Sequence, residues 1–356
     1  MTSRRIEEVR QLLVTSRLQG LLVTFLPNIR YLTGFTGTSA VFLLRMDEAF
    51  LITDPRYRDQ VSTEVSGVRT IIPRGNFPDA IVQRRLVSRK DRIGFEAMSL
   101  PFSTHAKLKK TFRNCTLVPT VSVVEQVRIR KDEREIEALK HAARITDKVF
   151  GKIITILKPG MREQEVAAEI SYWNRSFGAE GNAFDPIVVS GIRGALPHGR
   201  ATAKLLKRGE MVTIDMGCRV GGYRSDLTRT VSLGRARGEL KSIYRIVREA
   251  QEKALAAAAP TVKARALDAI ARKHIRRMGY GKLFPHALGH GLGLEIHERP
   301  LVSAKGTELL QESTVITIEP GIYVPGVGGV RIEDDIVLRQ TGNEVLTHSP
   351  KQLIEL

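Results

Sequence analysis

The spacing of apolar residues in the first third of the chain predicts a small domain of alternating helices and strands. Short runs rich in β-branched and aromatic residues predict strands at 20–24, 40–44, 48–53 and 69–73. The segment 6–18 repeats apolar residues at helical spacing and is followed by Gly20, a pattern typical of an amphipathic helix and its end. We therefore expect an α/β domain in this part of the chain.

The pattern changes after Pro119, where a charged run leads into longer helical repeats. Helices are predicted at 133–157, before Pro159-Gly160, and at 163–177, 238–258 and 264–278. Strand-like segments lie between them. We expect an α+β fold here and place the domain boundary near residue 125, which gives a smaller α/β domain at 1–124 and a larger domain at 125–356.

Four acidic residues of the larger domain lie in segments that are otherwise apolar or rich in glycine. Asp215 lies in VTIDMG, Asp226 in YRSDLTRT, Glu319 in VITIEPG and Glu333 in VRIEDD, and His290 lies in HALGHGLG. A carboxylate among β-branched residues is costly unless a positive group pairs with it. A lone aspartate in a strand is most often an edge or turn residue, but four such acids around one histidine call for cations.

The segments that carry Asp215 and Asp226 flank residues 219–222, RVGG, and predict a β-hairpin with a glycine turn. If the hairpin is centred between Val220 and Gly221, positions whose numbers sum to 441 face each other, as Asp215 and Asp226 do. Opposed residues on one face have Cβ atoms about 4.5–5.5 Å apart. A register shifted by two residues still leaves both side chains on the same face.

Glu319 and Glu333 flank a second loop, centred near Gly326, and their numbers sum to twice 326. They therefore face each other in a second predicted hairpin, although Pro320 indicates an irregular position there. Like charges opposed across strands repel, and two divalent cations would balance the four carboxylates. Oxygen ligands with one imidazole favour Mn²⁺, with Co²⁺, Fe²⁺ or Zn²⁺ as alternatives, over a site built from cysteine thiolates.

Sequence motifs along nearly the whole chain resemble one known family. PHG at His198, IDMG, YRSDLTRT, HALGHGLGLEIHE, IEPGIY and RIED are similar to motifs of the metallopeptidases with the pita-bread fold, which include methionine aminopeptidases, Xaa-Pro aminopeptidases, prolidases and creatinase. GLLVTFLPNIRYLTGFTGTSA and LITDPRYRDQ resemble the creatinase/prolidase N-terminal domain. The resemblance implies a pita-bread catalytic domain preceded by a creatinase-type domain, and pairing of the chain as a homodimer.

The resemblance also implies how the five candidate ligands divide between two metal ions. Asp215 would bind one ion, and His290 with Glu319 would bind the other. Asp226 and Glu333 would bridge the two ions. This division follows from the resemblance, since spacing alone does not distinguish terminal from bridging ligands.

Three more residues match positions that lie beside the metal site in this family: His198, His297 and Arg331. The two histidines would touch the substrate and stabilise the tetrahedral intermediate, and Arg331 would be a basic group near the metals. Glu319 would carry a proton to the leaving nitrogen, as general base and then acid. Without the resemblance, His198 could equally be an ordinary loop histidine before Gly199.

The resemblance implies hydrolysis of the bond between a first residue and proline, the Xaa-Pro bond. Dipeptidases of this family often carry an arginine four residues past the second active-site histidine, where it can bind the carboxylate of a dipeptide. Here that position is Leu301, and Arg299 is offset from it. We therefore expect an Xaa-Pro aminopeptidase acting on peptides with proline second, with an Xaa-Pro dipeptidase as the alternative.

Two other functions remain as alternatives on the same fold: a creatinase-like hydrolase and a non-catalytic binding protein. Such relatives lack part of the ligand set, whereas this chain has all five candidate ligands. A methionine aminopeptidase would lack a domain like residues 1–120. Measured metal content discriminates between an enzyme and a binding protein.

Length and cysteine content fit a protein of the cytoplasm. The 356 residues, 42% of them hydrophobic, can form two domains with their own cores. Two cysteines, Cys115 and Cys218, give no disulfide framework. The first residues mix acids and arginines, and the apolar segment that follows is interrupted by Pro27 and Arg30. We expect a cytoplasmic location and no membrane span.

The net charge of +18 is unusual, and basic residues cluster at 84–92 and 107–113. Such patches can attract polyanions. No nucleic-acid motif or interleaved aromatic residues accompany them. We expect a solvated basic surface and no specific nucleic-acid partner.

Overall fold

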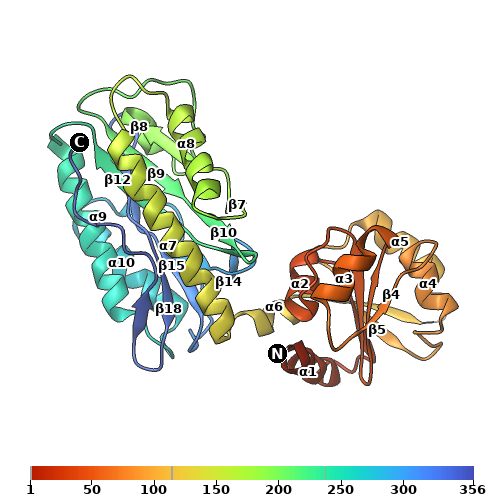
Figure 1. The fold of residues 1–356 in the computed structure, drawn as a ribbon. Coiled ribbons are helices and arrows are strands. Elements are labelled where there is room, and N and C mark those ends of the chain that lie inside the picture. Colours follow the sequence, from red (N-terminus) through yellow and green to blue (C-terminus); the bar gives the residue numbers. More distant parts are fainter. Residues whose placement is uncertain (1, 114, 237) are drawn as a thin grey trace. The chain divides into compact units, whose positions relative to one another are not determined.

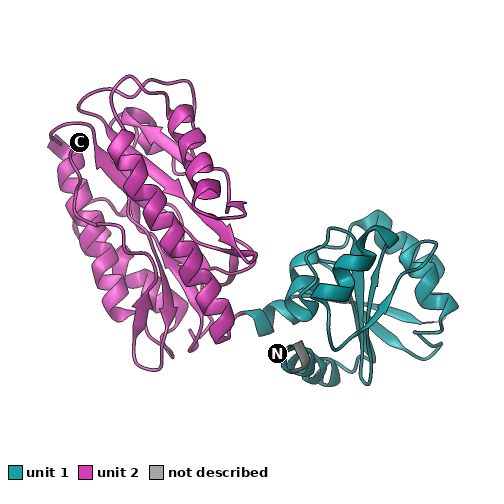
Figure 2. Cartoon of the chain, in the orientation of Figure 1, with its two compact units in different colours: residues 1–128 teal, residues 129–356 magenta. Residues whose placement is uncertain are grey.

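The computed structural model describes residues 2–113, 115–236 and 238–356, and its internal contacts divide the chain into two units, residues 1–128 and 129–356 (Figure 2). The division lies at the end of helix α6 (Val123–Arg128), and the expected boundary near residue 125 falls inside this helix. Each unit has its own sheet and apolar core.

The first unit is built on a six-stranded mixed sheet with the order β4-β3-β2-β1-β5-β6. Its strands are β1 (Gly20–Val23), β2 (Ala40–Arg45), β3 (Ala49–Thr53), β4 (Arg69–Ile71), β5 (Arg92–Glu96) and β6 (Thr116–Thr120). Its other helices are α1 (Thr2–Thr15), α2 (Leu26–Thr33), the 3-10 helix η1 (Pro55–Tyr57), α3 (Arg58–Glu64), α4 (Phe77–Gln83) and α5 (Phe102–Thr111). The four predicted strands are confirmed as β1 to β4, and the predicted first helix as α1.

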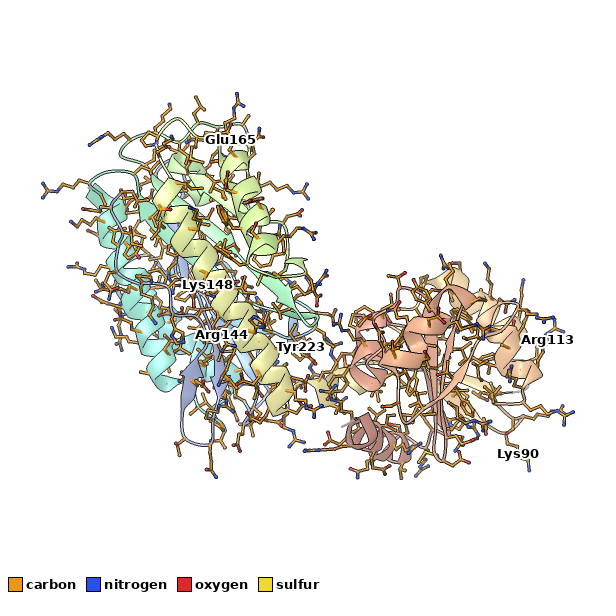
Figure 3. All side chains as sticks on the ribbon, in the orientation of Figure 1. Lys90, Arg113, Arg144, Lys148, Glu165 and Tyr223 are labelled. Carbon is orange, nitrogen blue, oxygen red and sulfur yellow. The ribbon has the colours of Figure 1, made fainter. Side chains whose placement is uncertain are left out.

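The basic clusters of this unit are exposed, as the sequence predicts. Residues 84, 85, 89, 90 and 92 and residues 107, 109, 110 and 113 are all exposed. Figure 3 shows Lys90 and Arg113 projecting outward from the loops before β5 and β6. Their charges are therefore solvated.

Among its described residues, the second unit carries four long helices: α7 (Glu133–Ile156), α8 (Glu163–Ser176), α9 (Gly238–Ala257) and α10 (Ala264–Arg277). All four were predicted within two residues of these bounds. The 3-10 helices are η2 (Gly191–Ala195) and η3 (Gly281–Leu283). Helix α7 begins where Asp132 and Glu135 form a capping box, in which each side chain accepts a backbone N–H of the other residue. It ends just before Pro159, which cannot continue a helix.

In the part of the second unit that the structure describes, the strands form four sheets with the orders β11-β10-β7, β12-β9-β8, β14-β13-β15-β18-β19 and β16-β17. The bounds are β7 (Gly181–Asn182), β8 (Ile187–Ser190), β9 (Met211–Met216), β10 (Cys218–Val220), β11 (Tyr223–Arg224), β12 (Leu227–Ser232), β13 (Gly289–Gly291), β14 (Glu298–Val302), β15 (Val315–Ile318), β16 (Gly321–Val324), β17 (Gly328–Arg331), β18 (Asp334–Leu338) and β19 (Asn343–Val345). The predicted α+β organisation is confirmed.

Helices of this unit pack on its strands (Figure 1). Helix α7 contacts β10 and β11, α8 contacts β8, α9 contacts β17, and α10 contacts β14. On β9, the apolar residues Val212, Ile214 and Met216 join the core formed with α7 and α8. Because strand side chains alternate between faces, Asp215 points away from that core.

The second hairpin has the predicted register, and the first is shifted by two residues. The numbers of paired residues add to 652 in both β15–β18 and β16–β17. Glu319 and Glu333, whose numbers have the same sum, therefore occupy opposed positions between these strand pairs. In the first hairpin, partners sum to 443, and Asp215 faces Thr228 rather than Asp226. The reason is the turn, which consists of Gly221 and Gly222, both with positive φ (56° and 83°). A two-residue turn of this kind needs positive φ at both central positions, and the adjacent glycines supply it.

Candidate metal centre

The five candidate ligands come from neighbouring strands of the second unit. Asp215 lies on β9, and Asp226 directly precedes β12. His290 is the central residue of β13, while Glu319 follows β15 and Glu333 precedes β18. Although the first hairpin is shifted, Asp226 is two residues from Thr228, the partner of Asp215, so both aspartates point to the same face.

Three of these side chains form a close buried group. Asp226, His290 and Glu333 offer ligand atoms that all lie within 4.8 Å of one another. The Nε2 atom of His290 is 3.7 Å from Oδ2 of Asp226 and 3.4 Å from Oε1 of Glu319. The Nδ1 atom of His290 is 3.0 Å from the carbonyl oxygen of Gly291, which leaves Nε2 facing the carboxylates. This orientation of a histidine, with one nitrogen held by the backbone and the other facing acids, is typical of metal ligands.

Asp215 is held by Arg331, whose Nη2 atom lies 2.6 Å from its Oδ2 atom. Arg331 also donates to the hydroxyl of Tyr323 (2.8 Å), the hydroxyl of Thr228 (3.1 Å) and the carbonyl oxygen of Pro197 (3.1 Å). The arginine is buried and fully engaged. One guanidinium therefore offsets part of the negative charge of the cluster.

The remaining negative charge strongly perturbs the carboxyl groups. Burial raises the pKa of Asp226 well above its ordinary value, and the charges of Glu333 and Asp215 raise it further. Burial, with repulsion from Glu319 and Asp215, does the same to the pKa of Glu333. Burial raises the pKa of Glu319 to about 8. Without cations, these groups would hold protons at neutral pH.

Several side-chain oxygens of these acids are buried and, in the part of the chain that the structure describes, lack a hydrogen bond. The Oδ1 atoms of Asp215, Asp226 and Asp335 have no hydrogen-bond partner among the described residues. Buried polar atoms are ordinarily satisfied. Divalent cations bound by oxygen ligands would satisfy the oxygens of Asp215 and Asp226 and neutralise the acids, so the residues present fit a metal site.

Three histidines surround the cluster. The ring of His297 packs edge-on against that of His290, with centroids 4.4 Å apart. His198 is exposed and follows η2. The pKa of His297 is lowered, first by its own burial and then by the charge of His198. Burial lowers the pKa of His286 to about 4, and its Nε2 atom lies 2.9 Å from the hydroxyl of Tyr323. Neutral imidazoles of this kind can donate a hydrogen bond to a developing oxyanion.

Sequence reasoning missed three residues that support the cluster. Asp335 accepts a hydrogen bond from the backbone N–H of Asp226 (2.8 Å), and the hydroxyl of Thr228 donates to Oε2 of Glu333 (2.6 Å). The third is Tyr323, the partner of Arg331. Asp335 could have been found from strand alternation, since it lies two residues past Glu333 and so shares its face.

Comparison with known families agrees with this geometry. The model of metallopeptidase family M24 matches residues 137–340, more than half of the chain. The chain belongs to metallopeptidase family M24. Its first unit matches the creatinase/prolidase N-terminal domain over residues 5–130. Enzymes of family M24 depend on two metal ions, and the buried cluster of Asp226, His290 and Glu333 is in keeping with that dependence.

Whole-chain relatives of this M24 protein include enzymes named for Xaa-Pro bonds. An Xaa-Pro dipeptidase of Pyrococcus horikoshii is 37% identical, with 98% of each chain covered. The structure of an Xaa-Pro dipeptidase from Bacillus anthracis is 40% identical, with a TM-score of 0.97 and 100% of each chain covered. The structure of an X-Pro aminopeptidase from Thermotoga maritima is 38% identical, with a TM-score of 0.89 and coverage of 96% and 98%. The expected Xaa-Pro peptidase of the pita-bread family is therefore confirmed at this level.

The described residues contain no helix that is both long and apolar enough to cross a membrane.

Proposed function

We propose that this M24 protein is a metal-dependent Xaa-Pro dipeptidase. The observation that carries the proposal is the complete acidic cluster around His290 on a chain that is similar over its whole length to two Xaa-Pro dipeptidases. These relatives favour the dipeptidase over the aminopeptidase that the sequence motifs led us to expect. The cluster argues against a binding protein, since such a protein has no need of repelling buried acids.

The proposed ligands are Asp215, Asp226, His290, Glu319 and Glu333, with Mn²⁺ as the expected metal and Co²⁺, Fe²⁺ or Zn²⁺ as alternatives. A bound pair of such ions supplies activation of water and polarisation of the scissile carbonyl. Arg331 holds Asp215 in place, and Thr228 holds Glu333.

The residues around the ligands supply proton transfer and orientation. Glu319 is also the proposed proton carrier: as an ionised carboxylate beside the bound ions, it would take a proton from the attacking water and deliver it to the leaving proline nitrogen. His297 and His198 are the proposed donors to the oxyanion of the tetrahedral intermediate. Burial lowers the pKa of His297, so its neutral ring can donate without adding a charge that would compete with the metals.

An aminopeptidase remains the second candidate, because one residue beside the site favours it. Leu301 is the ladder partner of His290, so an apolar side chain occupies the place where a dipeptidase often has an arginine. Arg299 does not substitute for it, because its guanidinium is paired with Glu308. A longer substrate would not need a cation at this position.

The test is the dependence of hydrolysis on substrate length. With Mn²⁺ added, rates on an Xaa-Pro dipeptide, the corresponding Xaa-Pro amide and an Xaa-Pro-Yaa tripeptide are compared. A dipeptidase cuts the dipeptide fastest and loses activity on the amide. Faster cleavage of the tripeptide would support the aminopeptidase, and no cleavage of any of them would exclude both. The homodimer and the cytoplasmic location stay predictions, to be tested by sedimentation and by cell fractionation.

A further inference from the structure

A fully buried carboxylate lies outside the metal centre and has no role in the chemistry described so far. Glu163 is the first residue of α8, and its side chain is 0% exposed. Its two oxygens accept hydrogen bonds from Ser190 and Thr202, in each case from both the backbone N–H and the hydroxyl, at 2.8 to 3.2 Å. The Nε atom of Arg193 adds an ion pair at 3.1 Å. So many donors on one carboxylate make a strong anchor.

The donors belong to the two ends of one loop. Residues 191–201, here called the His198 loop, run from the end of β8 at Ser190 to Thr202, where the chain begins to pair with residues 160–164. Glu163 therefore joins the start of the loop to its end. A loop that is closed at its base has fewer conformations open to the residues that it carries.

The far side of the loop is held by the metal centre. Arg331 donates to the carbonyl oxygen of Pro197, next to His198. Gly194 packs on the backbone of Gly329, since a Cβ atom added at Gly194 would lie 3.0 Å from the nitrogen of Gly329. His198 itself is exposed and lies near enough to His286 and His297 to affect their pKa values. The position of the His198 side chain is therefore set by the loop backbone on either side of it.

We propose that Glu163 is a positioning residue for His198. The carboxylate fixes the base of the loop, while Arg331 fixes its tip, and together they present the imidazole to the substrate. The proposal rests on the proposed function for the role of His198 in catalysis. If Glu163 only stabilised the start of α8, its substitution would lower the stability of the protein, and the effect on activity would not depend on His198.

Glu163→Gln tests this with little change in volume. The amide replaces one acceptor by an N–H group that faces the donors of Ser190 or Thr202, so the base of the loop opens. The matched control is Glu165→Gln, which removes an acid from the same turn of α8 (Figure 3). Glu165 is half-exposed and accepts a hydrogen bond from the N–H of Arg162, outside the loop.

We expect Glu163→Gln to lower kcat about 10-fold to 100-fold, the range typical of residues that orient catalytic groups, with a smaller change in KM. Mn²⁺ affinity, measured by calorimetry, should stay within about twofold. In the background of His198→Ala, the same substitution should have almost no further effect on kcat. Glu165→Gln should leave kcat unchanged. Equal losses of kcat with and without His198, or an unchanged kcat in Glu163→Gln, would overturn the proposal.

A second measurement does not depend on activity. Arg193 and Arg200 lie in the loop, and trypsin cleavage after them, mapped by mass spectrometry, reports on opening of its base. Cleavage should be several times faster in Glu163→Gln than in the parent protein or in Glu165→Gln. If the parent protein has no activity on Xaa-Pro peptides, the proposed function fails, and this measurement still decides on the loop. Unchanged cleavage would refute the positioning role.

Discussion

Leu301 lies directly opposite His290 in the antiparallel ladder between β13 and β14. Opposed residues project from the same face of a sheet, and the side chain of Leu301 is largely exposed. An apolar side chain is therefore placed beside the proposed metal centre, on a surface that a substrate can reach. Whether dipeptides or longer peptides are preferred therefore depends on whether residue 301 can bind the C-terminal carboxylate of a dipeptide.

Leu301→Arg should increase kcat/KM for Xaa-Pro dipeptides about 10-fold to 100-fold relative to tripeptides. A hydrogen bond to a charged group contributes about 1.5–3 kcal/mol, and the new guanidinium can reach the dipeptide carboxylate. Rates on the dipeptide, its amide and a tripeptide provide the measurement. Leu301→Gln is the control of similar size without a charge. A gain on the amide as large as that on the dipeptide would show that the carboxylate is not involved.

Asp226→Asn should abolish hydrolysis and leave a folded protein. The substitution removes a charge from the closest group of ligands, so kcat/KM should fall by more than the 10-fold to 100-fold typical of residues that only support ligands. Because Glu333 and Asp215 repel Asp226, the metal-free variant should be at least as stable to urea as the metal-free parent. Circular dichroism, metal analysis and urea unfolding check these points. Parental turnover in the variant would contradict the metal site.

Metal removal should make stability fall as pH rises. The pKa values of Asp226, Glu319 and Glu333 are raised in the folded protein, so the folded state binds more protons than the unfolded state between their ordinary and raised values. Stability is then highest near the ordinary carboxyl values, about pH 4, and is lost as the pH passes the folded value, about 8 for Glu319. The free energy of unfolding should fall by a few kcal/mol, since a difference of one in pKa between the folded and unfolded states corresponds to about 1.4 kcal/mol.

The measurement is urea unfolding at pH 5 and pH 8, with a chelator and with saturating Mn²⁺. Bound cations stabilise the ionised carboxylates, so the decline should disappear in the loaded protein. Glu319→Gln should flatten the decline of the metal-free protein. A metal-free protein that is more stable at pH 8 than at pH 5 would show that these acids are not buried together.

The sequence predicts those parts of the site that follow from strand alternation. The register predicted for Glu319 and Glu333 is correct. The numbers of paired residues add to 652 both in β16–β17 and in β15–β18, so the pairing is not shifted between the two strand pairs. The register of the first hairpin differs from the predicted one because its centre lies between Gly221 and Gly222, and not between Val220 and Gly221. The sequence allows both centres, and the conformation of the turn selects one of them. The shared face of Asp215 and Asp226 survives, since the shift is two residues.

Long-range packing accounts for what the sequence does not predict. Arg331 reaches Pro197 across 134 residues, and Asp226 receives its support from Asp335 across 109 residues. No spacing or periodicity links such pairs. The anchoring of the His198 loop by Glu163 is of the same kind, because a glutamate in the first turn of a helix is already explained by the helix dipole.

Lys131 and Glu298 form a buried pair next to His297, and breaking it should destabilise the second unit. The Nζ atom of Lys131 lies 3.1 Å from Oε2 of Glu298, and the two side chains are 1% and 6% exposed. Glu298 also accepts the N–H of Glu295, so it orders the segment that carries His297. Removal of Lys131 takes away the cation that lies against the buried carboxylate of Glu298, and breaking a buried pair in this way costs about 3–5 kcal/mol.

Lys131→Met should therefore lower the free energy of unfolding by about 3–5 kcal/mol, measured by urea unfolding of the metal-loaded protein. The double variant Lys131→Met/Glu298→Gln removes both charges and should recover much of the loss, because the carboxylate that Lys131 neutralises is removed with it. Lys140→Met is the matched control, since Lys140 is more exposed and its pairs with Glu137 and Glu344 contribute little. If Lys131→Met costs no more than this control, the pair does not hold the His297 segment.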